Sequence, residues 1–232
     1  MNDPATPPTP AAGVPAGMPT WFIPHGAGPC FFMAWSPPDA WSHTADFLKG
    51  LAATLPRRPS AIVLVSAHRL EPVIGVTSGA QPALIYDYHG FPAHTYTLRY
   101  DAPDSPELAP RIGALMGRSG QALTALRDEG VLIVGSGMSF HNMRGCGDPR
   151  FGPISDEFDQ WLRDAVQSAP AQRYRALVDW AQAPSARLSH PVHAEEHLLP
   201  LMVVAGAAGQ DAGRHAFSDR VLETTLSASR FG

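Results

Sequence analysis

Three histidines in the sequence each follow a short apolar run within a few residues. His25 comes after TWFI, His68 ends the run AIVLVSAH, and His141 follows VLIV through a glycine turn. Runs of this length that are rich in β-branched residues and bounded by Gly, Pro or Ser predict buried strands. A lone loop histidine is usually only hydrogen-bonded. Three at matching strand ends indicate a metal site, since neutral imidazole is the commonest metal ligand in proteins.

A fourth candidate lies in the segment HPVHAEEHLLPL, residues 190–201. His193 and His197 are spaced i, i+4, so they share one face if a helix begins this early. The segment is not the zinc motif HExxH, because alanine rather than glutamate follows His193. Glu195 and Glu196 are equally consistent with a helix N-terminus, where negative charge is favoured. On spacing alone, a ligand role and a helix-start role both stay open.

The two cysteines offer a second kind of ligand. Cys30 and Cys146 each stand five residues after a candidate histidine, and they form no CxxC pair. Thiolate ligands would indicate a closed structural zinc site. We interpret both side chains instead as small apolar groups that pack near the site. Two widely separated cysteines predict a reduced, cytoplasmic setting.

Strand patterns alternate with helical patterns along the chain. The expected strands are Thr20–Ile23, Ala61–Val65, Val73–Thr77, Thr95–Arg99, Val131–Val134 and one inside Leu222–Ser229. The expected helices are Ala40–Leu55, Ser105–Leu126, Ile154–Gln167, Tyr174–Ala181 and Ala194–Ala205. This alternation predicts an α/β fold, a single domain with a mostly parallel or mixed central sheet and helices on both faces. Sites in such sheets lie beyond the carboxyl ends of the strands, so the three strand-end histidines are expected to converge.

Length and charge limit the classes of protein to consider. The 232 residues suffice for one domain with a sizeable core. A net charge of −4 with 17 Lys and Arg residues leaves no basic stripe, which argues against nucleic acid as a partner. No apolar stretch reaches membrane-spanning length, which argues against a membrane partner. Residues 1–18 are rich in Pro and Ala and predict a disordered tail, followed by one domain over residues 19–232.

Taken together, these motifs resemble those of a known enzyme family. PHGAGPCFF, VLVSAH, LRDEGVLIVGSGMSFHNMR and EEHLLPL occur in this order. They are similar to the four histidine motifs of the DODA-type extradiol ring-opening dioxygenases, in the superfamily of the protocatechuate 4,5-dioxygenase catalytic subunit. YDYHGFP resembles the family's loop near the substrate. The likeness runs from about Pro19 to the C-terminus, and four motifs in order make it specific.

The resemblance implies a metal centre. It assigns His25, His68 and His197 as ligands of one Fe(II) ion, with Zn(II) as the other candidate metal. Glu196 is the alternative to His197, because related enzymes use two histidines and one glutamate. His141 would lie beside the metal, either as a further ligand or as the acid–base catalyst.

The resemblance also implies an activity. The expected reaction inserts O₂ into the ring of a catechol, DOPA-like or a related phenolic compound, and opens it beside the two hydroxyl groups. Tyr86, Phe91 and Pro92 are expected to contact this substrate. Two alternatives stay open: a zinc hydrolase that uses a metal-bound water, and a family member that binds metal without catalysis.

One departure from the family pattern affects these expectations. Family members carry a further strand and helix, with a GFDHG-like histidine motif, before the segment that matches LRDEGVLIVGSG. Here the stretch SPELAPRIGALMGRSGQALTALRDEG runs straight through without such a motif. We therefore predict a sheet one strand smaller than the family norm. The metal pocket should be more open, and activity low, unless a partner or a second subunit covers the gap.

Overall fold

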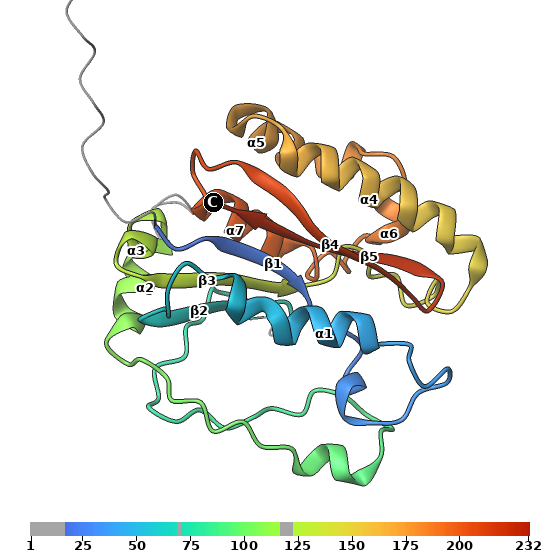
Figure 1. The fold of residues 1–232 in the computed structure, drawn as a ribbon, viewed down its shortest axis with the longest axis horizontal. Coiled ribbons are helices and arrows are strands. Elements are labelled where there is room, and N and C mark those ends of the chain that lie inside the picture. Colours follow the sequence, from blue (N-terminus) through green and yellow to red (C-terminus); the bar gives the residue numbers. More distant parts are fainter. Residues whose placement is uncertain (1–16, 69–70, 117–122) are drawn as a thin grey trace, which may run out of the picture.

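A five-stranded mixed sheet forms the centre of the molecule. The computed structural model describes residues 17–68, 71–116 and 123–232, and its strands follow the order β2-β3-β1-β5-β4 (Figure 1). β1, β2 and β3 are parallel, whereas β5 runs antiparallel to β1 and β4 antiparallel to β5. The strands are β1 (Thr20–Pro24), β2 (Ala61–Ser66), β3 (Val131–Gly137), β4 (Gly213–Val221) and β5 (Thr224–Phe231). The predicted mixed α/β fold is confirmed.

Seven α-helices surround this sheet in the described part of the chain. They are α1 (Ser42–Gly50), α2 (Leu108–Met116), α3 (Thr124–Asp128), α4 (Gly152–Gln167), α5 (Pro170–Val178), α6 (Ala186–Ser189) and α7 (Leu199–Ala207). Short 3₁₀ helices span Cys30–Phe32, Leu51–Thr54, Ala93–Thr97, Pro149–Phe151 and Trp180–Gln182.

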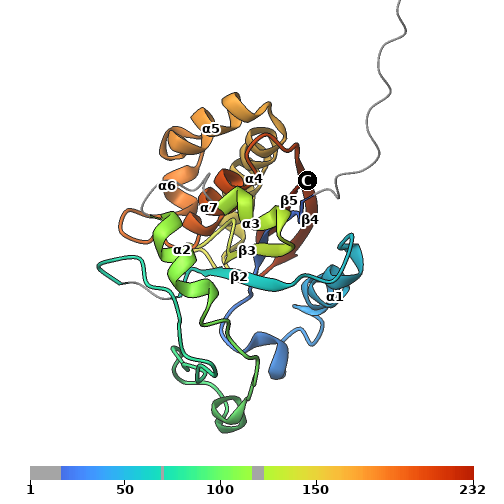
Figure 2. The ribbon, with the colours of Figure 1, turned by 90° about the vertical axis from the view of Figure 1, so that its left-hand side faces the viewer.

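The helices cover both faces of the sheet. On one face, Phe47 of α1 packs with Trp21 and Leu132. On the other face, α4 and α7 contribute Phe158 and Val204 to the main hydrophobic core. The side view shows α1 on one side of the strands and α7 on the other (Figure 2). This arrangement agrees with the predicted layers.

Strand β3 aligns the ends of its two parallel neighbours. It lies between β2 and β1, and nearly all of its residues are buried. Ile23 of β1 and Ser66 of β2 both pair with Ser136 of β3. Both neighbours therefore end at the same level, which brings the residues that follow them to one edge of the sheet.

Two predicted strands are not formed. Val73–Thr77 is irregular and solvent-exposed, and Thr95–Arg99 begins inside the 3₁₀ helix Ala93–Thr97 before becoming irregular. Prolines and glycines are frequent in residues 72–92 and interrupt a regular ladder. A β-branched run becomes a strand only where a neighbouring strand pairs with it. Strand β4, which the sequence pattern did not predict, pairs instead with β5.

The described part of the segment before β3 contains helices and no strand. The predicted helix Ser105–Leu126 corresponds there to α2 and α3. The expected absence of a strand agrees with residues 105–116 and 123–128, while residues 117–122 lie outside the described chain. The comparison with the family norm therefore stays a prediction.

Met18, at the start of the described chain, packs against the rest of the fold. Met18 is fully buried, and its backbone N–H donates to the carbonyl oxygen of Arg127 at 3.0 Å. Residues 1–16, which make up most of the predicted tail, lie outside the described chain, so the tail stays a prediction. Among the described residues, no helix is long and apolar enough to cross a membrane.

Candidate metal centre

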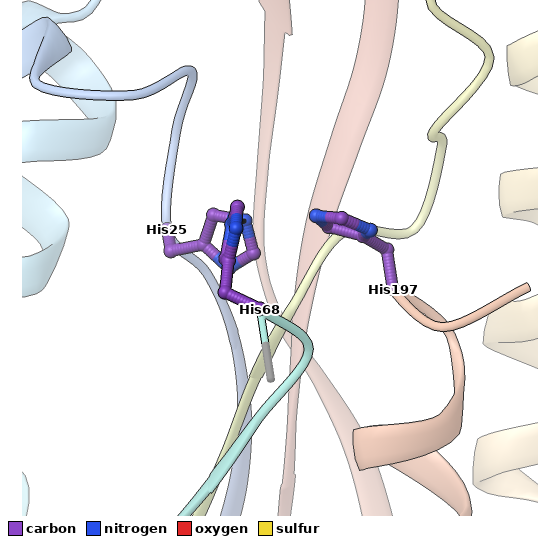
Figure 3. Close-up of side chains that lie close together, drawn as sticks. All are labelled: His25, His68 and His197. Atoms are coloured by element: carbon purple, nitrogen blue, oxygen red, sulfur yellow. Dashed lines mark hydrogen bonds between the residues drawn. The ribbon is translucent and has the colours of Figure 1, made fainter. Parts of the chain in front are cut away.

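Three of the predicted metal ligands meet at the carboxyl edge of the parallel strands. The ring centroids of His25 and His68 lie 4.5 Å apart, and His197 lies 5.0 and 4.9 Å from them. The Nε2 atoms of His25 and His68 are 2.9 Å apart. One ligand nitrogen from each residue falls within 4.8 Å of the others, and the three rings face a common space (Figure 3).

Backbone contacts place His197 opposite the two strand-end histidines. The N–H of Met138, directly after β3, donates to the carbonyl oxygen of His197 at 2.9 Å. Gly137 permits this approach, because a Cβ there would lie 2.2 Å from the same oxygen. Helix α7 then begins at Leu199. The close contact between β3 and the start of α7 therefore fixes the third ring.

Polar side chains hold His25 and His68 through their outer nitrogens. The Ser136 hydroxyl lies 3.2 Å from His25 Nδ1, and Asp87 Oδ2 lies 2.9 Å from His68 Nδ1. An ionised carboxylate can only accept a hydrogen bond, so Asp87 favours the proton of His68 on Nδ1. That tautomer leaves a lone pair on Nε2, which faces the shared space. Histidines that bind metals are typically oriented in this way.

Glu196 occupies the equivalent position behind His197. Its Oε1 atom lies 2.9 Å from His197 Nδ1 and 3.5 Å from His141 Nδ1. The carboxylate therefore lies on the outer side of the His197 ring. His141, Glu196 and His197 also form a second group whose ligand atoms lie within 4.8 Å of one another. The geometry favours His197 as the inner ligand and Glu196 as its support.

The two more buried candidate ligands, His25 and His197, are neutral imidazoles at pH 7. Burial, reinforced by the neighbouring histidines, lowers the pKa of His25 to about 3 and that of His197 to about 2. A neutral imidazole keeps one nitrogen lone pair for a cation. The trio thus offers an uncharged all-nitrogen donor set. This set fits Fe(II) or Zn(II), both of which imidazole suits.

His141 lies against the trio rather than within it. Its ring stacks on His197, with centroids 3.4 Å apart and planes 16° from parallel. Its backbone N–H donates to the Ser189 carbonyl oxygen at 3.0 Å, which fixes the loop after β3. Burial lowers the pKa of His141, and the Glu196 carboxylate acts in the opposite direction. A neutral imidazole beside a carboxylate can accept a proton and have the resulting charge stabilised.

His193 is far from the helical geometry that its spacing suggested. Its φ angle is +67°, and α7 begins six residues later at Leu199, so no helical face joins it to His197. The predicted helix Ala194–Ala205 therefore began too early. Pro200 is compatible with the first turn of α7, which is where a helix tolerates proline.

Cys30 follows the apolar interpretation, whereas Cys146 is exposed and does not. Cys30 is buried, and burial raises the pKa of its thiol to about 12, which keeps it protonated. Neither Cys30 nor Cys146 belongs to a group of metal-compatible ligands in the described chain. Both are free thiols.

The loop YDYHGFP lies next to the turn that carries His25. The Phe91 ring packs on Gly28, where an added Cβ would come within 3.0 Å of it. The Tyr86 hydroxyl donates to the Leu98 carbonyl oxygen at 2.5 Å, and the Pro92 carbonyl oxygen accepts from Thr95. These contacts stiffen the loop. The predicted substrate contacts of Tyr86, Phe91 and Pro92 stay predictions.

Asp87 and Ser136 are the site residues that the sequence reasoning missed. Asp87 lies inside the motif that resembled a substrate loop, and Ser136 lies between Gly135 and Gly137 near the end of β3. A general rule could have suggested Asp87, because metal-binding histidines almost always donate to a carboxylate, a carbonyl or water. Nothing in the spacing indicated Ser136. Its role depends on the strand register that pairs it with Ile23.

The fold is a mixed α/β sheet with a histidine trio that could hold a metal at its carboxyl edge, and comparison with known proteins identifies its family. Residues 113–229 match the family described as the catalytic LigB subunit of aromatic ring-opening dioxygenase. The chain belongs to this family. Its relatives are extradiol dioxygenases, and the histidine cluster agrees with a metal-dependent oxidoreductase of this type.

Individual relatives support the same assignment. The dioxygenase TasH of Hapsidospora irregularis is 30% identical over 238 residues, covering 76% of this chain and 72% of its own length. The 4,5-DOPA dioxygenase extradiol of Beta vulgaris is 31% identical over 210 residues, covering 67% and 76%. The enzyme of the same name from Escherichia coli strain K12 is 31% identical over 208 residues, covering 68% and 75%. Each alignment is longer than the part of this chain that it includes, so these relatives contain stretches that this chain lacks.

A solved structure supports the fold. The crystal structure of uncharacterized protein JW3007 from Escherichia coli K12 superposes with a TM-score of 0.69. The match covers 93% of this chain and all of that chain at 24% sequence identity.

Proposed function

We propose that the protein is an Fe(II)-dependent extradiol dioxygenase that opens the ring of a catechol, DOPA-like or a related phenolic compound. One observation carries the proposal: three imidazoles converge at the carboxyl edge of parallel strands, with a fourth stacked beside them. When bound, the ferrous ion supplies the Lewis acidity and the open positions that catechol and O₂ require. His25, His68 and His197 would hold it.

In this proposal His141 is the acid–base catalyst. It is neutral at pH 7 because burial lowers its pKa, so it can take a proton from a catechol hydroxyl. Glu196 Oε1, 3.5 Å from His141 Nδ1, would stabilise the resulting imidazolium. The same histidine can later return the proton to the product. Stacking on His197 keeps its ring next to the substrate position.

The loop with Tyr86, Phe91 and Pro92 is proposed to bind the aromatic ring. The Phe91 ring packs on Gly28, three residues beyond His25. His94 Nε2 lies 2.8 Å from the Phe32 carbonyl oxygen and ties the loop to the turn after β1. An aromatic loop fixed beside the ligands would hold the substrate in one orientation, which is a large part of catalysis for two bound reactants.

Two free thiols are consistent with a reducing cytoplasm as the setting of the protein.

One observation favours a second candidate function. Three histidines without a carboxylate are also the ligand set of catalytic zinc, with a fourth position for water. With zinc bound, the same site would suit hydrolysis, with His141 as the base. A metal-binding member without activity is the third candidate.

Oxygen uptake separates these candidates. Purified protein is freed of metal, loaded anaerobically with Fe(II) or with Zn(II), and mixed with a panel of catechols in an oxygen electrode. We expect oxygen consumption and a yellow ring-opened product with Fe(II) only. Hydrolysis of esters or amides by the Zn(II) form, without oxygen uptake by the Fe(II) form, would support the hydrolase. Stoichiometric metal without either activity would support the non-catalytic member.

A further inference from the structure

Strand β2 ends the sheet with an unprotected edge. Only β3 pairs with it, and no backbone hydrogen bond reaches its other edge from the described residues. Its sequence AIVLVS contains no charged residue, proline or glycine. Natural edge strands usually carry lysine, proline or a bulge, because a bare edge recruits another strand. From this edge we propose that the protein forms a symmetric dimer, in which β2 pairs antiparallel with β2 of a second copy.

Backbone alternation identifies the residues that would pair. The Ala67 N–H donates to the Ser136 carbonyl oxygen, which continues the β2–β3 ladder. Alternate residues of a strand direct their backbone groups to opposite edges. Ile62, Leu64 and Ser66 therefore direct their N–H and C=O groups outward, toward a new strand.

The side chains on this edge are apolar and uncovered. Ile62 is 59% exposed and Leu64 61% exposed. They pair with Leu132 and Val134, which the α1 face of the core buries. Helix α1 therefore covers the side chains of β3 on this face but leaves those of β2 exposed. An exposed apolar cluster on an open sheet edge is typical of an interaction site.

The neighbouring segment extends this apolar surface instead of covering it. In Figure 1 residues 71–104 run below β2, away from the sheet, and in Figure 2 most of this segment also lies below the strand. Large apolar side chains on this segment are exposed, namely Val73, Ile74, Leu84, Ile85 and Tyr100. A second copy seated on β2 would have these side chains within its reach.

Charge favours a second copy in the antiparallel direction. Arg57 and Arg58 precede β2, whereas Glu71 and Asp87 lie beyond its other end; all four are exposed, and Asp87 also contacts His68 within the same chain. In an antiparallel pair, the basic end of each strand lies beside the acidic end of the other. A parallel pair would place like charges together. The edge is thus complementary to itself, which is the requirement for a two-fold interface.

The outward backbone groups suggest a register. A two-fold axis at Leu64 places Leu64 opposite Leu64 of the second copy and Ile62 opposite Ser66. Residues directly opposite in an antiparallel pair project to the same face, so the two Leu64 side chains would pack together. The dimer would also bring the second copy beside His68, whose side chain is 44% exposed.

Oligomeric state is the first test, and it is independent of metal and of activity. The full chain is measured by size-exclusion chromatography with light scattering over a wide concentration range. We expect twice the monomer mass for the native protein and the monomer mass for Leu64→Lys, because two lysines would face each other across the axis. Val178→Lys on α5, at a position also 61% exposed, should remain a dimer. A monomeric native protein, or dissociation by Val178→Lys but not by Leu64→Lys, would overturn the proposal.

Crosslinking tests the register. In a Cys146→Ser background, Leu64→Cys should form a covalent dimer under mild oxidation, because opposite Cα atoms about 5.5 Å apart suit a disulfide. Ile62→Cys is the matched control on the same face and should crosslink poorly, since it lies opposite Ser66. Absence of crosslinking at Leu64, or equal crosslinking at both positions, would contradict this pairing.

Discussion

At the scale of single residues, metal affinity should depend on the partners of the histidine Nδ1 atoms, which orient the rings, as well as on the nitrogens that face the metal. Glu196 and Glu195 are adjacent, but only Glu196 contacts His197, while Glu195 pairs with Arg187. Glu196→Gln should weaken metal binding by about 10- to 100-fold, because it removes the charged acceptor that orients His197. Glu195→Gln should leave the affinity unchanged. Titration of metal-free protein with Fe(II) or Zn(II) measures both, and equal affinities would refute this role for Glu196.

Replacing His141 should lower the catalytic rate constant while leaving substrate binding nearly unchanged. We expect His141→Ala to lower kcat about 10²- to 10⁴-fold with little change in KM, since proton transfer contributes mainly at the transition state. Steady-state kinetics with the best catechol from the screen provides the measurement. An unchanged kcat would remove His141 from the mechanism, and loss of stoichiometric metal in this variant would make it a ligand instead.

At the scale of elements, the close contact of β3 with the start of α7 can be tested at one glycine. A Cβ at position 137 would lie 2.2 Å from the His197 carbonyl oxygen, which is backbone and cannot move aside cheaply. Gly137→Ala should therefore destabilise the fold by about 1–3 kcal/mol, as overpacking does. It should also weaken metal binding by displacing His197.

The control for this variant is Gly50→Ala. Its added Cβ would meet nothing within 4 Å, so its stability should be equal or slightly higher. Denaturant unfolding and metal titration of both variants provide the measurement. Similar effects of the two substitutions would mean that the β3–α7 contact is not what positions His197.

The elements also show what the sequence could and could not predict. β1, β2 and β3 were predictable because each is a short, uninterrupted apolar run rich in β-branched residues, although only β1 and β3 are mostly buried. β4 carries charged and polar residues and a bulge near Phe217, so it shows no clear alternation. Its turn to β5 uses Leu222 and Glu223 at positive φ, without the glycine or asparagine that signals a hairpin. β4 is recognisable only from its pairing with β5, which the sequence pattern does not reveal.

The candidate site also has parts that the sequence could predict and parts that it could not. The histidines at strand ends were predictable, because parallel strands present their carboxyl ends at one edge. Which residues lie behind them was not, since Asp87 reaches His68 from a loop nineteen residues further along the chain. Likewise, His193 looked like a partner of His197 only under a helical assumption that its backbone does not meet.

At the scale of the whole molecule, the buried site makes stability depend on pH. The folded-state pKa values of His25 and His197, about 3 and about 2, lie below the ordinary value of 6.5. The unfolded chain therefore binds more protons below pH 6.5, and the free energy of unfolding falls as the pH falls toward these folded values. Above pH 6.5 these two groups contribute no pH dependence.

Thermal unfolding of metal-free protein between pH 4 and pH 8 checks this expectation. The midpoint should be nearly level above about pH 6.5 and decline below it. His25→Gln should decline less steeply, because it removes one of the buried titrating groups. A stability that rises as the pH falls from 6.5 to 4 would contradict the assignment of neutral, buried imidazoles.

The proposed metal centre joins three separate parts of the chain, so metal content is its most direct test. The native protein, loaded and desalted, should contain one metal ion per chain by elemental analysis. His25→Ala, His68→Ala and His197→Ala should each lose this stoichiometric metal. His43→Ala should keep it, because His43 lies on α1 and contacts Asp219 and Phe217 of β4 and belongs to neither candidate ligand group of the described chain. Full occupancy in each of the three variants would contradict the central claim.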